Sequence, residues 1–225
     1  LRNARGELHP DPVVAAKFAK KAGADSITIH LREDRRHIVD KDLRSINSKL
    51  KIPLNLEIAA TKEMLNIALK SKPDFICIVP EKRQEITTEG GLNLNYKKNF
   101  LKKMILKLKK NKSRVSLFIE PNLKDVEKAY HLKADCVEFH TGRFCNLVNN
   151  NRNFKKELNK IKKSVILANK NGLEVHAGHG LNYKSAKMLS KIKLIKEFNI
   201  GHFLIGESIF IGLPNCIKNF KKALR

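Results

Sequence analysis

Histidine and glutamate side chains interrupt several short apolar runs of this 225-residue chain. The run "ITIHL" contains His30, "LNLEIA" contains Glu57, "VEFHTG" contains Glu138, and "EVHAGHG" contains His179. An ionisable group is costly to bury among apolar side chains unless it is paired or takes part in function. Imidazole and carboxyl groups with different pKa values can exchange protons with a substrate, so these residues predict general acid–base chemistry.

Residues suited to anion binding stand near the same runs. "HLREDRRHI" supplies Arg32 and His37, and Arg5 lies near the start of the chain. A guanidinium group forms strong charge-assisted hydrogen bonds with phosphate. Gly180 in "AGHGL" and Gly206 in "IGES" would let backbone N–H groups approach an oxyanion closely. These features together predict phosphorylated small-molecule substrates.

Two polar segments would frame such a site. The stretch "EKRQEITTEGGLN", residues 81–93, is long and polar, and we expect it to form a mobile lid. The other charged residues of "HLREDRRHI" are expected only to brace their loop; they are Glu33, Asp34, Arg35 and Arg36.

Short β-branched runs alternate with longer segments of helical period along the whole chain. The predicted strands cover residues 26–31, 53–59, 75–80, 115–120, 136–142, 174–180 and 201–209. The predicted helices cover residues 11–22, 39–50, 61–71, 96–111, 123–132, 152–171, 184–196 and 214–224. Strands that alternate with helices indicate βαβ units and a parallel sheet.

This rhythm predicts an α/β fold with a single domain over residues 1–225, a (β/α)8 TIM barrel with extra helices. Seven predicted strands leave the first strand of the barrel missing from this chain, which begins at Leu1 rather than at a methionine. In such a barrel the carboxyl ends of the strands gather the active site, which is where the histidines and glutamates fall. An open doubly wound sheet is the alternative, although no GxGxxG follows a first strand.

The net charge of +24 raises the question of a nucleic-acid partner. The lysines lie on the polar faces of amphipathic helices, and no RNA-binding motif accompanies them, so we favour a solvated surface. The four cysteines form no CxxC pair, which favours a reduced, cytoplasmic protein. No apolar run approaches the roughly 20 residues of a membrane span, and no signal-peptide pattern is present.

A metal site is a weaker interpretation of the same histidines. The chain has no HExxH and no HxH on an early strand. His176 and His179 are spaced so that a strand would point them to opposite faces. We therefore do not favour a metal site.

Several motifs in consistent order resemble the pyridoxine 5'-phosphate synthase family of the deoxyxylulose-dependent vitamin B6 pathway. They are "LRNARG", "DPVVAAKFAKKAGADSITIHLREDRRHI", "LNLEIA", "VPEKRQEITTEGGL", "VSLFI", "EFHTG", "AGHGLNY" and "NIGHFLIGESI". The resemblance implies a (β/α)8 barrel, a homo-octamer and a reaction without metal or cofactor. It also implies condensation of 3-amino-1-hydroxyacetone 1-phosphate with 1-deoxy-D-xylulose 5-phosphate to pyridoxine 5'-phosphate, phosphate and water.

The resemblance implies roles for individual residues. His30 and Glu57 match proton acceptors of the family, His179 matches the proton donor, and Glu138 matches a residue that stabilises the transition state. The positions that match the pocket for deoxyxylulose phosphate are Arg32, His37 and Thr87. Those that match the site for the amino-ketone phosphate are Arg5, Gly180, Gly201 and His202.

This chain departs from the family in one respect. The family has a first strand ahead of "LRNARG" that ends in an Asn-x-Asp-His segment with substrate ligands, and we expect truncation to account for its absence here. Another phosphosugar enzyme of the barrel class, an aldolase or isomerase, is the second hypothesis. A Schiff-base lysine at a strand end would support it, whereas Lys82 lies in a predicted loop.

Overall fold

The computed structural model describes residues 2–81 and 90–225, and its centre is a parallel sheet. Seven strands follow one another in sequence order, and each pairs in parallel with the next. They are β1 (Ile27–His30), β2 (Leu54–Ala59), β3 (Phe75–Val79), β4 (Arg114–Ile119), β5 (Cys136–His140), β6 (Glu174–Gly178) and β7 (Ile195–Asn199).

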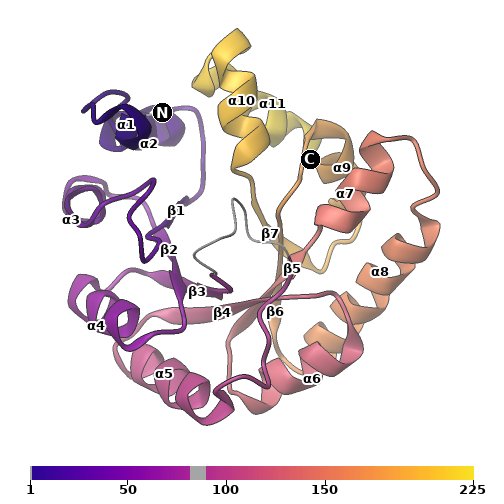
Figure 1. Cartoon of the computed structure of the whole chain (residues 1–225). Helices are drawn as coiled ribbons and strands as arrows, with labels where there is room; N and C mark the ends of the chain where they lie inside the picture. Colours follow the sequence, from indigo (N-terminus) through magenta and orange to yellow (C-terminus); the bar gives the residue numbers. More distant parts are fainter. Residues whose placement is uncertain (1, 82–89) are drawn as a thin grey trace.

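Helices connect the strands and cover the outer face of the sheet (Figure 1). They are α1 (Arg2–Arg5), α2 (Pro12–Lys21), α3 (Asp40–Lys49), α4 (Lys62–Ser71), α5 (Lys98–Lys110), α6 (Leu123–His131), α7 (Gly142–Asn149), α8 (Lys155–Lys170), α9 (Tyr183–Leu189), α10 (His202–Ile211) and α11 (Leu213–Ala223). Local sequence begins several of them. Asp11 accepts a hydrogen bond from the backbone of Val13 ahead of Pro12, and Thr61 caps α4 in the same way.

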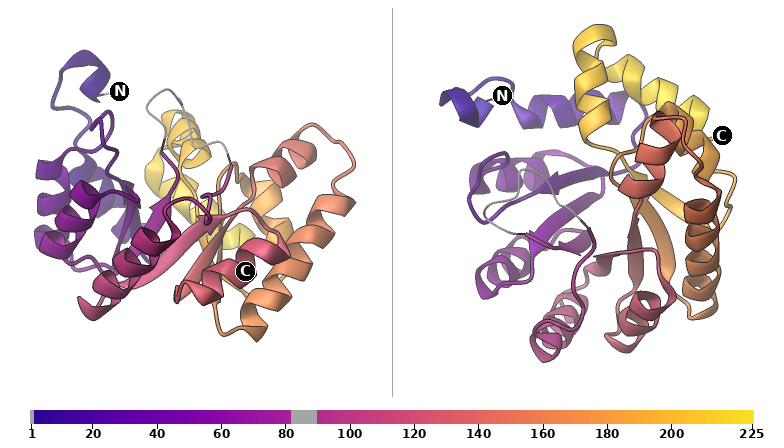
Figure 2. Two further views of the ribbon diagram at one scale, coloured as in Figure 1. Left: turned by 60° about the horizontal axis from the view of Figure 1, so that its bottom comes forward. Right: turned by 45° about the vertical axis from the view of Figure 1, so that its right-hand side comes forward.

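The sheet curls around a central axis, as the two views of Figure 2 also show. Its helices lie on the outside only, which distinguishes it from a doubly wound sheet with helices on both faces. The prediction of a TIM-type barrel that lacks one strand is therefore confirmed. Among the described residues the strand order begins at β1 and ends at β7, so the curled sheet remains open between them.

The opening between β1 and β7 is a seam with its own contacts. A cavity of about 830 Å³ lies there, lined by residues 24–29, residues 195–201 and apolar side chains of α2, α10 and α11. Thr28 Oγ1 donates a 2.8 Å hydrogen bond to Asn199 Oδ1 across the seam. Helices α2 and α11 also contact each other, so the two ends of the sheet are held together.

Alternate residues of each strand face opposite environments, as the two-residue period of a strand requires. Apolar side chains such as Leu56, Ile78, Leu117 and Val137 are buried between sheet and helices. The intervening positions face the barrel axis. They include the polar residues Asn55, Glu57, Ser116, Glu138 and His176 and a small apolar cluster of Cys77, Val79 and Phe118. The apolar side chains buried between sheet and helices therefore stabilise a barrel whose interior is largely polar.

The C-terminal part of the prediction was wrong. The last strand is β7, which begins in the final residues of the predicted helix 184–196. The predicted strand 201–209 is instead helix α10. "HFLIGESIFI" is apolar on all sides and lacks the alternation of a half-buried strand, so composition alone misled the assignment. Helix α7 was not predicted, because "GRFCNLVN" is short and directly follows β5.

The four cysteines, Cys77, Cys136, Cys145 and Cys216, are free and buried. No helix within the described residues combines the length and apolar character needed to cross a bilayer.

Candidate active site

His30 lies between two carboxylates at the carboxyl ends of β1, β2 and β3. The β1–β2 register places it directly beside Glu57, whose Oε2 is 3.7 Å from His30 Nδ1. Glu81 follows β3, and its Oε2 is 3.5 Å from His30 Nε2. Burial raises the pKa of Glu57, and the nearby His30 only partly opposes this shift. A carboxylate with a raised pKa is a better proton acceptor near neutral pH.

Arg32 is a buried cation with unused hydrogen-bond donors. Its side chain is 4% exposed, and Nε lies 3.6 Å from Glu81 Oε1 and 3.8 Å from Asp34 Oδ1. Within the described part of the chain, Nε and Nη2 have no hydrogen-bond partner. Buried donors that stay unsatisfied are costly. An anionic ligand with several oxygens, such as phosphate, would satisfy them.

The rest of the charged loop is braced by neighbouring elements. Arg35 donates to Asp40 at 2.9 Å and to Glu63 at 2.6 Å, which confirms its predicted structural role. The side chain of Asn3 donates to the backbone oxygen of His37 at 3.0 Å. These bonds fix the loop that carries Arg32.

His37 is exposed in this loop, and helix α1 borders the loop. Burial, together with the positive charges of Arg32 and Arg36, lowers the pKa of His37. Arg5 is exposed at the end of α1, and α1 is held against the backbone of His37 by Arg2 and Asn3. Among the described residues, no hydrogen bond or ion pair joins Arg5 to Gly180, Gly201 or His202, with which it was predicted to bind one substrate.

Glu138 lies deeper in the barrel and is 2% exposed. Asn199 Nδ2 donates to its Oε2 at 2.8 Å, and the thiol of Cys77 lies 3.7 Å from the same oxygen. Burial raises the pKa of Glu138 well above its ordinary range, and the charges of Glu57 and Glu197 raise it further. The surroundings of Glu138 therefore favour its protonated form over its charged form more strongly than water does.

His179 forms a second histidine cluster across the mouth. Its ring centroid is 4.7 Å from that of His140, and His140 Nδ1 is 2.9 Å from Glu120 Oε1. The hydrogen bond with His140 lowers the pKa of Glu120 despite burial. Burial lowers the pKa of His179, and the charges of His140 and His202 lower it further. Protonated His179 is consequently a stronger acid than an exposed histidine.

The predicted glycine sites lie beside His179 and at the start of α10. Gly180 follows His179, and both residues adopt positive φ, +77° and +74°. A smaller cavity of about 390 Å³ includes His140, His179 and Gly180 among its lining residues. Gly201 is the N-cap of α10 and His202 is its first residue. Free backbone N–H groups at a helix start favour an anion.

Thr87 and most of the predicted lid, residues 82–89, lie outside the described residues. The remaining predicted residues fall into two groups around the mouth, one at β1–β3 and one at β5–β7. His30, Glu57 and Arg32 belong to the first group, and Glu138 and His179 belong to the second. The structure therefore brings acid–base and anion-binding residues to one end of the barrel.

Sequence reasoning missed two glutamates that organise this site. Glu81 and Glu120 each follow a strand directly, in "IVPE" and "LFIE", and each contacts a histidine of the mouth. The rule that polar residues at strand ends gather in a barrel would have found both. Asn199 was missed because its segment was predicted to be a loop.

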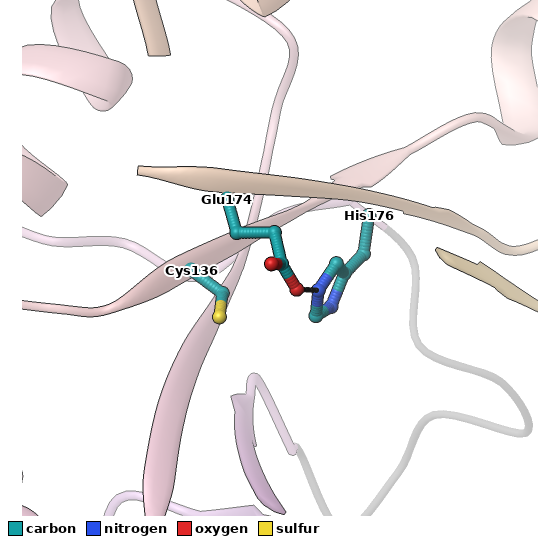
Figure 3. Close-up of side chains that lie close together, drawn as sticks. All are labelled: Cys136, Glu174 and His176. Atoms are coloured by element: carbon teal, nitrogen blue, oxygen red, sulfur yellow. Dashed lines mark hydrogen bonds and ion pairs between the residues drawn. The ribbon is translucent and has the colours of Figure 1, made fainter. Parts of the chain in front are cut away.

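A separate polar cluster lies at the amino ends of β5 and β6 (Figure 3). Ligand-type atoms of Cys136, Glu174 and His176 lie within 4.8 Å of one another. The guanidinium of Arg114 contacts two of them, at 3.2 Å from the Cys136 sulfur and 3.1 Å from Glu174 Oε1. Burial raises the pKa of Cys136 to about 12, so it is a thiol. We describe this cluster as an ion-pair network around Arg114.

Comparison with known proteins identifies the family. A family model described as "Pyridoxal phosphate biosynthesis protein PdxJ" matches residues 1–225. The pyridoxine 5'-phosphate synthase of Pelagibacter ubique (strain HTCC1062) is 57% identical over 222 residues, covering 99% of this chain and 93% of that protein. The pyridoxine 5'-phosphate synthase of Zymomonas mobilis is 51% identical, covering 98% of this chain and 86% of that protein.

Solved structures support the fold. The 3-keto-L-gulonate-6-phosphate decarboxylase from Vibrio cholerae has a TM-score of 0.67 at 14% identity, covering 95% of this chain and 91% of that one. Phosphoribosyl anthranilate isomerase from Thermotoga maritima has a TM-score of 0.63 at 14% identity, covering 94% and 93%. At this identity the likeness concerns the fold alone, whereas the sequence matches extend over the whole chain. The chain belongs to the PdxJ family of pyridoxal phosphate biosynthesis proteins.

Proposed function

We propose that this chain is a pyridoxine 5'-phosphate synthase. It would condense 3-amino-1-hydroxyacetone 1-phosphate with 1-deoxy-D-xylulose 5-phosphate to pyridoxine 5'-phosphate, phosphate and water. The family match and the names of its relatives support the reaction. The observation that carries the proposal is the buried guanidinium of Arg32, with free donors beside the histidine–carboxylate group of His30.

The chemistry requires several proton transfers. An amine attacks a ketone, the resulting imine loses protons and water, a phosphate leaves, and the ring closes and becomes aromatic. Groups with separated pKa values can serve these steps in turn. His30 and Glu57 would accept protons, and His179, whose pKa is lowered, would donate one. Glu138 would stabilise developing charge as a neutral acid in the barrel interior.

Two anionic substrates need two binding regions, and the mouth offers both. Arg32 and His37, with Thr87, would hold the phosphate of deoxyxylulose phosphate. The second region would hold the amino-ketone phosphate through Arg5, Gly180, Gly201 and His202. The positive end of α10 and the left-handed turn at His179 and Gly180 support that second region.

We further propose a cytoplasmic homo-octamer that needs no metal or organic cofactor, with small phosphorylated substrates and no nucleic-acid partner. Size-exclusion chromatography with light scattering tests the oligomer. Treatment with a chelator followed by assay tests the independence from metal. A binding assay with labelled polynucleotide at physiological salt tests the absence of a nucleic-acid partner.

A direct assay tests the reaction. The purified chain, with any upstream residues its gene encodes, is mixed with both substrates, and pyridine-ring absorbance and released phosphate are followed together. Both signals should appear in parallel. His30→Ala, Glu57→Ala and His179→Ala should each reduce the rate by at least about 100-fold. His131→Ala, at an exposed histidine of α6, should retain the parental rate. A folded protein that produces neither signal would overturn the proposal.

An aldolase or isomerase acting on a phosphosugar is the second candidate, because proteins of those classes share this fold. A Schiff-base mechanism requires a lysine near the reacting carbonyl. None of the seven described strands ends in lysine; their last residues are His30, Ala59, Val79, Ile119, His140, Gly178 and Asn199. Borohydride trapping with each substrate would detect a Schiff base, and we expect no covalent adduct.

A further inference from the structure

Glu81 is a buried carboxylate that lies beside both His30 and Arg32. Its side chain is 3% exposed and lies directly beyond β3 and Pro80. Burying a charge is costly unless other groups compensate for the lost hydration. The compensating groups here are His30, Arg32 and the backbone N–H of Glu33. A buried charge surrounded in this way has a defined position and can define the positions of its partners.

The two oxygens of Glu81 face different partners. Oε1 accepts a 2.8 Å hydrogen bond from the Glu33 backbone and lies 3.6 Å from Arg32 Nε. Oε2 lies 3.5 Å from His30 Nε2, and neither of these two buried atoms has a hydrogen-bond partner among the described residues. Burial raises the pKa of Glu81, but the nearby His30, the hydrogen bond from the Glu33 backbone and the charge of Arg32 lower it overall. Glu81 therefore remains ionised.

The geometry around His30 resembles the support that a carboxylate gives to an imidazole acting as a base. Such a carboxylate holds the ring in one tautomer and stabilises the imidazolium that forms when the ring accepts a proton. Glu81 faces Nε2, which leaves Nδ1 on the side of Glu57. The ionisable groups facing His30 in the described structure are Glu57 on β2, Glu81 beyond β3, and Arg32 and His37 in the loop after β1.

We propose that Glu81 is a positioning residue that orients His30 for proton transfer and Arg32 for phosphate binding through one buried carboxylate. This inference rests on the proposed function for its kinetic consequences, but its structural consequences are independent of turnover. Because a single group serves both partners, its loss should affect proton transfer and phosphate binding together. A merely structural glutamate would instead affect only the stability of the fold.

The test uses Glu81→Gln, which keeps the shape and an acceptor for the Glu33 N–H but removes the charge. We expect kcat to fall on the order of 10- to 100-fold, a part of what acid–base catalysis contributes. We expect KM for deoxyxylulose phosphate to rise several-fold, since Arg32 loses its anchor.

Two measurements separate this proposal from the proposed function. The ring nitrogen resonances of His30, assigned with His30→Ala, should show a changed proportion of the two neutral tautomers in Glu81→Gln. Calorimetry with inorganic phosphate should show several-fold weaker binding in Glu81→Gln. Both measurements can be made even if no pyridoxine 5'-phosphate is formed. Glu127→Gln is the matched control, because Glu127 is an exposed glutamate of α6; it should leave all readouts unchanged.

An unchanged proportion of His30 tautomers together with unchanged phosphate affinity in a folded Glu81→Gln variant would overturn the proposal. A loss of activity that only follows a loss of folded protein in thermal melts would do the same. Glu81→Asp provides a second variant if the amide fails to fold. It keeps the charge at a shorter reach, and we expect a proportion of His30 tautomers between those of the parent and Glu81→Gln.

Discussion

Gly178 provides the space that the carboxyl group of Glu138 occupies. A Cβ atom on residue 178 would lie 1.9 Å from Glu138 Oε1, well inside any allowed contact. Glu138 is buried and held by Asn199, so its carboxyl group cannot simply swing into solvent. A glycine on β6 is therefore a condition for the buried carboxyl group of Glu138 to occupy this place in the barrel interior.

Gly178→Ala should displace Glu138 and inactivate the protein. We expect the rate of product formation to fall at least tenfold and the free energy of unfolding to drop by about 1–3 kcal/mol, as overpacking typically costs. Assay and chemical denaturation measure the two effects. Gly206→Ala on α10 is the matched control, because a Cβ there meets no atom within 4 Å. Equal behaviour of the two variants would contradict the steric explanation.

Asn199 should be required for the orientation of Glu138. Its side chain donates to Glu138 and accepts from Thr28, so it links the interior acid to the seam between β1 and β7. Asn199→Ala should reduce the rate about 10- to 100-fold. It should lower the free energy of unfolding by about 1–3 kcal/mol, because buried polar groups lose their partners. Asn215→Ala, at an exposed residue of α11, serves as the control. A parental rate in Asn199→Ala would remove this residue from the site.

The ion pair of Glu120 with His140 should make stability depend on pH in the acid range. Folding lowers the pKa of Glu120, so the pair stabilises the fold at neutral pH. This contribution is lost as the pH falls below the ordinary pKa of a glutamate, about 4.3. The Glu120 side chain is 36% exposed, which limits the effect to about 0.5–1 kcal/mol. Chemical denaturation should give a lower free energy of unfolding for Glu120→Gln than for the parent at pH 7, and this difference should be smaller near pH 4.

Glu127→Gln provides the reference for that experiment, since Glu127 is an exposed glutamate of α6. Its stability should follow the parent at both pH values. Because Glu120 also accepts a 3.0 Å hydrogen bond from the Gly91 backbone, the Glu120→Gln variant should in addition exchange the Gly91 amide hydrogen faster. If the loss of unfolding free energy in Glu120→Gln were larger near pH 4 than at pH 7, the prediction that folding lowers the pKa of Glu120 would be contradicted.

Arg2 should stabilise the loop that carries His37. Its guanidinium donates to Asp42 Oδ1 at 2.9 Å and to the backbone oxygen of His37 at 3.2 Å. Burial raises the pKa of Asp42, but Arg2 and the Val39 N–H lower it overall, so this stabilisation is present at neutral pH and lost as pH falls. Arg2→Ala should cost about 1–3 kcal/mol at pH 7, because Asp42 is left buried without its partner.

Lys221→Ala is the comparison for Arg2→Ala. Lys221 pairs with Asp25 at 2.6 Å, but Asp25 is 85% exposed, so removal of this pair should cost at most about 1 kcal/mol. The free energies of unfolding of both variants at pH 7 distinguish the part-buried ion pair of Arg2 from the exposed ion pair of Lys221. A smaller loss in Arg2→Ala than in Lys221→Ala would show that α1 does not hold the loop.

Much of the fold follows from local sequence. The alternation of apolar runs and amphipathic segments predicted six of the seven strands near their observed positions, and the predicted helix 11–22 coincides with α2. The start of α10 was not predictable in this way. "HFLIGESIFI" has no amphipathic pattern, and only its place after β7 makes it a helix.

The sequence by itself determined which residue types stand at the strand ends, because a parallel barrel collects those ends at one mouth. His30, Glu57, Glu138 and His179 were found on that ground. Only the tertiary structure decided how they are paired and charged. The contact of His30 with Glu81, the raised pKa of Glu138 and the free donors of Arg32 depend on strand register, sheet curvature and burial. Those properties arise between segments distant in sequence, where local patterns carry no information about distance or solvent.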